Sequence, residues 1–276
     1  MDDIIQTKNI TKAVRGKRLV ADISIRIKKN EIYGFLGQNG AGKTSLLKML
    51  TGMTIPSSGE VLLFDEKLTE KNKSGLSRVG SIIEYPVFFG HLTAFENLKL
   101  HCEYLGFYDE NEMIYALQLV KLGNIEDKAV KDFSLGMKQR LGIARAIVTK
   151  PELIILDEPT NGLDPMGIKD IRQLIRMLNR EYGITFVLSS HILGELEQIV
   201  DRVGVIHHGK LLSEMTMEDI RKERSDYIEL EVTDVKRAAL VLEKELHITN
   251  MKIIQDDKIR IYDMTHSQSD IAGMLI

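Results

Sequence analysis

Apolar and polar residues alternate along the first part of the chain and then give way to short, continuous apolar runs. Residues 4–10 and 19–27 alternate in the manner of half-exposed strands. The runs at 32–36, 153–156 and 186–188 are short and almost wholly apolar, as in parallel strands that are buried on both faces. The pattern predicts an α/β fold with a strand-rich N-terminal part and a parallel core.

A helical pattern replaces the strand pattern over residues 93–148. Apolar residues recur at helical spacing at 98–105 and again at 113–120, and residues 141–148 form a third helical segment. We therefore expect a helical subdomain at about residues 88–150.

The character of the chain changes again after Gly209. The elements expected there are a strand at 227–232, an amphipathic helix at 235–246, and two paired strands at 251–254 and 258–262 that turn at Asp256 and Asp257. The apolar tail at 271–276 is expected to pack against another surface or to continue into further chain. We expect a first domain at 1–216 and a small α+β appendage at 217–276.

An octapeptide with three glycines follows the apolar run at 32–36 and leads into an apolar-periodic helix. The glycines allow a tight turn that points several backbone N–H groups at an anion, and the helix adds the positive end of its dipole. Lys43 is expected to bind the β- and γ-phosphates of a nucleotide, and Thr44 to ligate Mg²⁺. The residues predicted to bind the nucleotide are Gly37, Gln38, Asn39, Gly40, Ala41, Gly42, Lys43, Thr44 and Ser45.

Three downstream segments supply groups that could act on a bound phosphate. Asp157 and Glu158 end the buried strand at 153–156, where Asp157 would hold Mg²⁺ and Glu158 would polarise the attacking water. Ser134 precedes a helix, and its hydroxyl and the free amides beside it form a second anion site. His191 ends an apolar strand, where it could bond a terminal phosphate or the attacking water.

The order of these segments resembles the ATP-binding cassette (ABC) family over residues 3 to about 215. That order is the phosphate loop, the segment at Ser134, the acidic strand, the run Asn161-Gly162-Leu163-Asp164 and then His191. Within this family the chain is similar to the ATPase subunits of bacitracin-resistance and lantibiotic-immunity exporters. The residues that carry this narrower resemblance are 81–86, 91–98, 134–139 and 160–165.

The resemblance implies a P-loop NTPase fold, in which an ABC ATPase core carries an antiparallel β subdomain and a helical subdomain. Two copies of the chain are expected to form a homodimer across two ATP molecules, with each phosphate loop facing the signature segment of the other copy. The signature residues expected at the partner's nucleotide are Ser134, Leu135, Gly136 and Met137, and Asp164 is expected to communicate between the two sites. ATP hydrolysis would then energise an integral membrane permease made by other chains.

Three positions depart from the usual pattern of the family. Glu84 stands where a glutamine usually contacts Mg²⁺ and the attacking water, and we expect Glu84 to keep this catalytic and metal-binding role. Leu135 and Met137 replace glycine and glutamine in the signature, so only Ser134 and Gly136 match the pattern of the family cleanly. Val14 replaces the aromatic residue that stacks on adenine, which leaves the preference between adenine and guanine open.

The aromatic stretch 85–89 lies at the entrance to the helical insertion. The resemblance places there a groove that receives a cytoplasmic helix of the permease. The alternative is that Phe88 and Phe89 pack within the helical subdomain.

Composition narrows the class of protein further. The 276 residues, 43% of them hydrophobic, suffice for one large core and an appendage. The net charge of -3 argues against a chain dominated by nucleic-acid binding, and the single cysteine, Cys102, excludes an internal disulfide. No apolar run approaches the roughly 20 residues needed to cross a bilayer. We therefore expect a cytoplasmic chain that reaches the inner face of the membrane through its permease.

Two function classes remain open from the sequence. The leading one is the energising subunit of an exporter, whose substrate would by analogy be a peptide antibiotic or a similar amphiphile. The alternative is a soluble ABC ATPase that acts on nucleic acid or ribosomes, but such proteins usually carry two cassettes or a long coiled-coil insertion, and neither is present. A phosphate-loop kinase or GTPase does not account for the signature helix, and the Asn-Lys-x-Asp motif that reads guanine does not appear.

Overall fold

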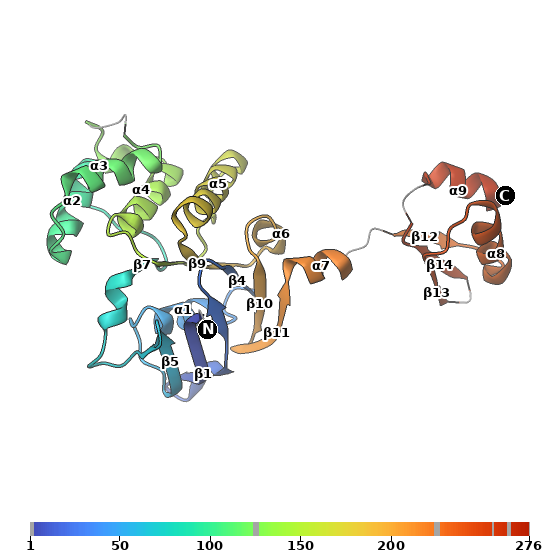
Figure 1. The fold of residues 1–276 in the computed structure, drawn as a ribbon, viewed down its shortest axis with the longest axis horizontal. Coiled ribbons are helices and arrows are strands. Elements are labelled where there is room, and N and C mark those ends of the chain that lie inside the picture. Colours follow the sequence, from blue (N-terminus) through green and yellow to red (C-terminus); the bar gives the residue numbers. More distant parts are fainter. Residues whose placement is uncertain (1–2, 124–126, 224–226, 256, 264–265, 276) are drawn as a thin grey trace. The chain divides into compact units, whose positions relative to one another are not determined.

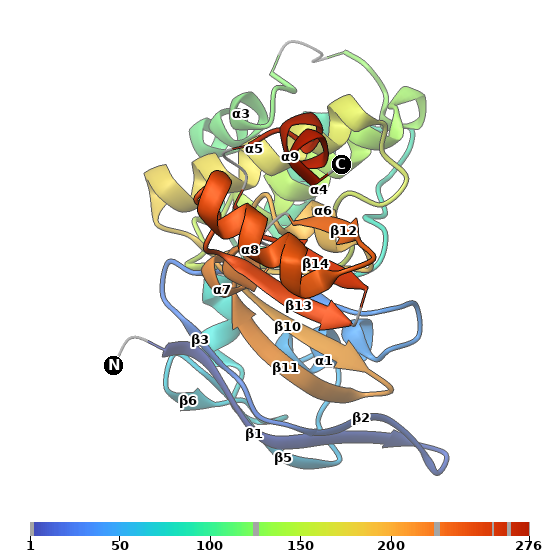
Figure 2. The same ribbon diagram turned by 90° about the vertical axis from the view of Figure 1, so that its right-hand side faces the viewer.

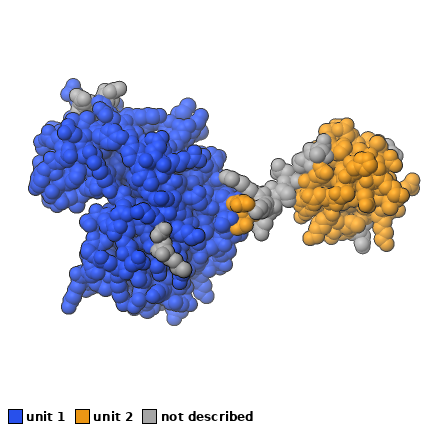
Figure 3. Space-filling view, viewed as in Figure 1, with its two compact units in different colours: residues 1–217 blue, residues 218–276 orange. Residues whose placement is uncertain are grey.

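The computed structural model describes residues 3–123, 127–223, 227–255, 257–263 and 266–275. The chain divides into two compact units, Met1–Met217 and Glu218–Ile276 (Figure 3). All the candidate site residues belong to the first unit.

A six-stranded sheet forms the centre of the first unit (Figure 1). Its strand order is β11-β10-β4-β9-β8-β7, and neighbouring strands are parallel except for the β10–β11 pair. Strands β8 and β9 are buried along their whole length, which confirms the prediction from their continuous apolar runs. The strands are β4 (Ile32–Leu36), β7 (Val79–Ile82), β8 (Leu153–Leu156), β9 (Thr185–Ser190), β10 (Arg202–His207) and β11 (Lys210–Thr216).

The carboxyl ends of β4, β9 and β8 meet at one edge of this sheet, because the three strands are consecutive parallel neighbours. The phosphate loop follows β4, Asp157 follows β8 and His191 follows β9. The topology therefore brings together residues that lie far apart in the sequence. Helix α1 (Lys43–Leu50) leaves the phosphate loop and buries Leu46 and Leu50 in the core.

An antiparallel sheet shares its core with the central sheet, and its long strands run side by side in Figure 2. The strand order is β2-β1-β5-β6, and β3 pairs with β1. The common core joins Ile10 and Val20 of this sheet to Phe35 of β4 and Leu47 of α1. The strands are β1 (Asp3–Val14), β2 (Lys17–Ile23), β3 (Arg26–Lys28), β5 (Ser58–Leu63) and β6 (Glu66–Lys67).

Three helices occupy the span in which the sequence predicts a helical insertion. They are α2 (Ala94–Leu105), α3 (Glu110–Leu119) and α4 (Leu135–Ile147), drawn in green in Figure 1. Thr93 and Glu96 form a capping box at the start of α2, and the Asp109 side chain caps α3. Two short 3₁₀ turns lie at Ser74–Arg78 and Val130–Asp132.

Helices α5 (Pro165–Tyr182) and α6 (Leu193–Leu196) complete the first unit. Asp164 caps α5 by accepting a hydrogen bond from the Gly167 N–H group at 3.0 Å, and Pro165 occupies the first turn. The helix buries one apolar stripe and ends at Gly183, which has a left-handed conformation (φ 66°).

The second unit is a small α+β module. Its sheet has the antiparallel order β12-β14-β13, as the paired-strand pattern predicts. Helix α8 packs on this sheet, and Ile271 of α9 is fully buried in the same small core. Asp256 and Ile276, which belong to the predicted turn and tail, lie outside the described residues. The elements are β12 (Ile228–Glu231), α8 (Val235–Glu245), β13 (Met251–Gln255), β14 (Lys258–Ile261) and α9 (Gln268–Leu275). Helix α7 (Met217–Glu223) begins at the last residue of the first unit.

In the part of the chain that the structure describes, every helix is too short or too polar to span a bilayer.

Candidate active site

The phosphate loop joins β4 to α1, and close backbone approaches determine its shape. Gly42 caps α1 in a left-handed conformation (φ 108°), which favours glycine. A Cβ atom at Gly37 would lie 2.4 Å from the carbonyl oxygen of Ile206, and one at Gly42 would lie 2.5 Å from that of Leu19. Because no side chain among the described residues caps α1, the N–H groups of its first turn are available to an anion.

The Lys43 ammonium group lies between the phosphate loop and the end of β8. Its side chain is only 5% exposed, and Nζ donates to the carbonyl oxygens of Gly37 at 2.7 Å and Gln38 at 3.3 Å. Nζ also forms an ion pair with Oε1 of Glu158 at 3.0 Å. Residues 38–40, at the tip of the loop, are exposed to solvent. The loop thus presents a fixed cation beside an accessible tip.

Thr44 and Asp157 are in direct contact at the carboxyl edge of the sheet. The Thr44 hydroxyl donates to Oδ2 of Asp157 at 2.7 Å, and the Ser189 hydroxyl donates to Oδ1 at 2.6 Å. A hydroxyl and a carboxylate oxygen are ligands that Mg²⁺ accepts, with its other positions left to water and phosphate oxygens. The two residues therefore fit the ion that the sequence predicts for them.

Glu158 contacts both of the other groups predicted to act on the phosphate. Its Oε2 lies 2.7 Å from Nδ1 of His191, while Oε1 pairs with Lys43. Glu158 adopts a left-handed backbone conformation (φ 48°), which is uncommon for a residue with a side chain. The structure therefore gathers three predicted catalytic residues, from three segments of the chain, into one cluster.

Ser189 belongs to the site, although the sequence analysis did not single it out. Its hydroxyl accepts a hydrogen bond from the Glu158 N–H group at 2.8 Å and donates to Asp157. Because Ser189 is fully buried, one hydroxyl fixes both acids at the end of β8. The available signal was its position two residues before His191, at the carboxyl end of a predicted strand.

Glu84 lies two residues beyond β7, in a left-handed conformation (φ 64°). Its carboxylate forms an ion pair with the Lys48 ammonium group on α1 at 2.6 Å, and the Glu84 side chain is 61% exposed. Its expected contact with metal or water stays a prediction. Val14, at the end of β1, is 46% exposed and therefore available to a ligand.

The signature segment is partly exposed at the start of α4. Ser134 caps this helix, as predicted, by accepting a hydrogen bond from the Met137 N–H group at 3.2 Å. Leu135 is 42% exposed, and Gly136 has only Leu163 within 4 Å of the position that a Cβ atom would take. Within the described residues, no hydrogen bond or ion pair joins 134–137 to the phosphate loop of the same chain.

The aromatic stretch 85–89 contains both packed and exposed side chains. Arg145 lies 4.9 Å from the centre of the Phe88 ring and donates to the Val87 carbonyl oxygen at 3.1 Å. Tyr85, Val87 and Phe89 expose 67%, 80% and 53% of their surface. Burial lowers the pKa of Arg145, while burial and the nearby Arg145 charge lower the pKa of His101 to about 4. The exposed side chains lie on a loop that Arg145 anchors to α4.

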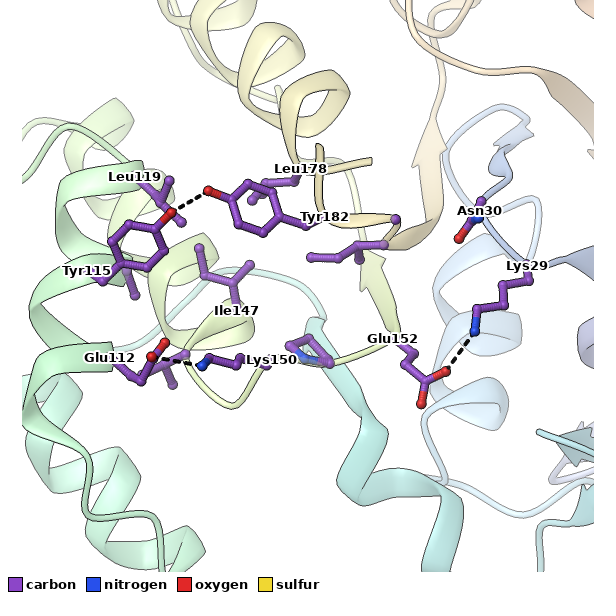
Figure 4. Close-up of a pocket in the computed structure, with 15 residues that line it drawn as sticks. Lys29, Asn30, Glu112, Tyr115, Leu119, Ile147, Lys150, Glu152, Leu178 and Tyr182 are labelled. Carbon is purple, nitrogen blue, oxygen red and sulfur yellow. Dashed lines mark hydrogen bonds and ion pairs between the residues drawn. The ribbon is translucent and has the colours of Figure 1, made fainter. Parts of the chain in front are cut away.

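A cavity of about 570 Å³ lies between α3, the end of α5 and the turns that lead into β4, β8 and β9 (Figure 4). The hydroxyl groups of Tyr115 and Tyr182 bond across it at 2.5 Å, and Glu112 pairs with Lys150 at 2.8 Å. Its lining residues at the sheet come before the strands, whereas the phosphate loop and the two acids follow them. The cavity is therefore at the opposite edge of the sheet from the candidate active site.

The turn between β10 and β11 supports the back of the phosphate loop. The Gly209 N–H group donates to the carbonyl oxygen of Ala41 at 2.8 Å, and the Ala21 N–H group donates to the carbonyl oxygen of Gly209 at 2.8 Å. Gly209 has φ 76°, and a Cβ atom there would lie 2.6 Å from the Leu19 carbonyl oxygen. Backbone hydrogen bonds therefore join the loop, β2 and this turn.

Gly209→Ala is expected to raise the dissociation constant for ATP about tenfold, because the added Cβ atom displaces the backbone that holds Ala41. The same change should cost roughly 1–3 kcal/mol of stability. Gly16→Ala is the matched control, since Gly16 is also left-handed (φ 79°) but has no atom of the described chain within 4 Å of its Cβ position. Nucleotide titration and thermal melting of both variants check this. Equal ATP affinities for the two would contradict it.

The geometry defines the class of protein first. A glycine-rich loop joins a strand to a helix that begins with a buried lysine and a threonine, and two acids contact these residues. This arrangement is the site of a nucleotide-hydrolysing P-loop protein. The chain belongs to the ABC transporter family, whose family model matches residues 20–161.

Curated relatives are similar to this chain over most or all of its length. The uncharacterized ABC transporter ATP-binding protein YcbN of Bacillus subtilis is 54% identical over 100% of this chain and 90% of its own length. The bacitracin transport ATP-binding protein BcrA of Bacillus licheniformis is 44% identical, with the same coverage. The lantibiotic transport ATP-binding protein SrtF of Streptococcus pyogenes is 41% identical over 76% of this chain and 90% of its length. These similarities confirm the resemblance to the bacitracin and lantibiotic group.

Solved structures confirm the fold. MJ1267, an ATP-binding cassette of an ABC transporter in its ADP conformation, is 25% identical and matches 82% of this chain and 96% of its own, with a TM-score of 0.74. The dimeric bacterial cassette MJ0796 is 25% identical and matches 77% of this chain and 98% of its own, with a TM-score of 0.69. The chain is therefore an ABC ATPase that binds ATP and hydrolyses it to ADP and phosphate. The relatives do not favour the alternative of an ATPase acting on nucleic acid or ribosomes.

Proposed function

We propose that this chain energises an exporter of a peptide antibiotic or a similar amphiphile. The observation that carries the proposal is its 44% identity, over the full chain, to a protein named for bacitracin transport. The contacts among Lys43, Thr44, Asp157 and Glu158 support it, because they supply the parts that ATP hydrolysis requires. Resistance or immunity to the exported compound would follow.

Hydrolysis would begin with an exchange of partners at Lys43. The ammonium group leaves Glu158 for the β- and γ-phosphates of ATP, while the N–H groups of the loop and of α1 bind the remaining phosphate oxygens. Glu158 can then accept a hydrogen bond from the attacking water, and His191 holds its carboxylate in place. Thr44 and Asp157 would hold Mg²⁺, which spreads the charge that develops on the phosphates. Glu84 would contact the metal or the water from the end of β7.

A homodimer would complete each site. Ser134 and Leu135 are exposed and Gly136 and Met137 are half-buried, and no hydrogen bond or ion pair among the described residues joins them to their own phosphate loop, so we assign residues 134–137 to the nucleotide of the partner subunit. The amides at the start of α4 would face the γ-phosphate, and Asp164, which caps the neighbouring helix, would communicate between the sites. The dimeric cassette MJ0796 supports this arrangement. Loss of the γ-phosphate would then loosen the dimer.

The membrane permease would bind the exposed stretch 85–89. Three large side chains there are more than half exposed on a loop that connects Glu84 to the helices, and exposed apolar patches of this kind mark interaction sites. The nucleotide-binding domain would comprise residues 1–216, and the appendage at 217–276 would take no part in the chemistry. The chain would lie in the cytoplasm, at the inner face of the membrane.

Co-purification and antibiotic resistance test the proposed function together. The tagged chain should be recovered from detergent-solubilised membranes with an integral membrane protein. Cells that carry both proteins should tolerate more bacitracin than cells in which the ATPase carries Glu158→Gln. Recovery from the soluble fraction alone, with hydrolysis stimulated by RNA or ribosomes, would favour the alternative class instead.

A further inference from the structure

Lys48 and Glu84 form an ion pair beside the candidate active site. The Lys48 Nζ atom lies 2.6 Å from Oε1 of Glu84, across 36 residues of sequence. Lys48 is 34% exposed and Glu84 is 61% exposed, so the pair itself adds little to stability. The position of the pair, and not its effect on stability, points to a function.

Both members of the pair are tied to the residues that would hold the metal. Lys48 follows Thr44 by four residues on α1, which places the two on one face of the helix. Glu84 follows β7, and the carbonyl oxygen of Ile82 at the end of β7 accepts a hydrogen bond from the Asp157 N–H group at 2.8 Å. The pair therefore spans the same two elements, α1 and the β7–β8 edge, that Thr44 and Asp157 join.

Several negative charges lie at this edge of the sheet, and a positive charge is needed to balance them. Asp157 and Glu158 are already present, and Lys43 pairs with Glu158. Glu84 adds a third carboxylate just beyond β7, at the same edge of the sheet as the proposed phosphate site. An unpaired carboxylate there would repel the phosphates modestly, because Glu84 is 61% exposed and solvent screens its charge.

We infer that Lys48 is a positioning residue that neutralises Glu84 and holds it beside α1. With Lys48 in place, Glu84 presents a carboxylate oxygen to the site without adding net negative charge. The inference rests on the proposed place of Glu84 beside the nucleotide. It assigns Lys48 no contact with the phosphates, which distinguishes its role from that of Lys43.

A double-mutant cycle tests this assignment. The isolated full-length chain is prepared as wild type, Lys48→Gln, Glu84→Gln and the double variant. The dissociation constant of a fluorescent ATP analogue is measured with Mg²⁺ and with EDTA, together with the melting temperature. Lys99→Gln is the matched control, because Lys99 forms a similar exposed ion pair with Glu110 at 2.7 Å.

Lys48→Gln alone should weaken binding about three- to fivefold, the scale expected for an exposed charge pair. In the Glu84→Gln background the same substitution should change the dissociation constant by less than about twofold, since no carboxylate is left to neutralise. Lys99→Gln should have no effect on binding. An equal loss in both backgrounds would mean that Lys48 binds phosphate directly or supports the fold, and no loss in either would mean a surface pair without function. Both results overturn the inference.

The binding assay is independent of any membrane partner. A chain that shows the expected rescue but recovers no permease would refute the proposed transport function and leave the role of Lys48 intact. A chain that supports antibiotic resistance but shows no rescue would refute the role of Lys48 and leave the proposed transport function intact.

Discussion

Glu158→Gln is expected to slow ATP hydrolysis by a factor of about 10²–10⁴, the usual contribution of a general base, while ATP binding is retained. The amide keeps the shape of the side chain but cannot take a proton from water. It also removes the 3.0 Å ion pair with Lys43, so the ammonium group no longer has to leave a carboxylate when nucleotide binds. The variant should accumulate as an ATP-bound dimer. Phosphate release and light scattering with Mg²⁺ and ATP measure the two effects.

Glu152→Gln is the matched control for this experiment. Glu152 is also a glutamate next to β8, but it precedes the strand, where it pairs with Arg78 at 2.7 Å and Lys29 at 3.4 Å. Its replacement should leave hydrolysis close to wild type. If Glu158→Gln turned over at the wild-type rate, another group would have to polarise the water.

Lys43→Ala should raise the dissociation constant for ATP by a factor of about 10–100, because a hydrogen bond to a charged group is worth roughly 1.5–3 kcal/mol. The substitution removes the buried cation of the phosphate loop and leaves Oε1 of Glu158 without its 3.0 Å partner. A second expected effect is therefore a loss of stability. Titration with a fluorescent ATP analogue and thermal melting report on the two effects separately.

The double variant Lys43→Ala/Glu158→Gln separates binding from folding. It removes both charges of the pair, so its melting temperature should recover toward the wild-type value, whereas its affinity for ATP should stay low. Recovery of both quantities would show that Lys43 acts by neutralising Glu158 and not by binding phosphate.

The parts of the site that follow strands could be predicted from the sequence. Continuous apolar runs give buried parallel strands, and the carboxyl ends of such strands meet at one edge. This places the phosphate loop, Asp157 and His191 together without any knowledge of their contacts. The helix start at Ser134 was predictable for a similar reason, because a serine before an apolar-periodic segment is a common cap.

Pairings between distant side chains could not be predicted in this way. Periodicity shows which face of an element is buried, but it does not identify the partner of a given charge. The Lys43–Glu158 and Lys48–Glu84 pairs depend on how α1 sits against the ends of β8 and β7. The hydroxyl of Ser189 looked like one more polar residue in a strand, although it bonds to both acids.

In the second unit, several elements were predicted from the sequence and a helix was missed. The strand expected at 227–232 is found at Ile228–Glu231, and the helix expected at 235–246 is found at Val235–Glu245. The helix Gln268–Leu275 was not predicted, because its short apolar run has no clear period. The burial of Ile271 shows that this segment packs within the unit's own core.

The hydrogen bond from Gly209 to Ala41 has a consequence for folding during synthesis. The loop residues leave the ribosome early, but β10, which pairs with β4, and the turn that bonds to Ala41 are made about 170 residues later. A nascent chain that ends before this turn carries the whole nucleotide-binding sequence without the backbone that shapes it. We therefore expect a chain that ends before β11 to bind nucleotide more weakly than the full-length chain.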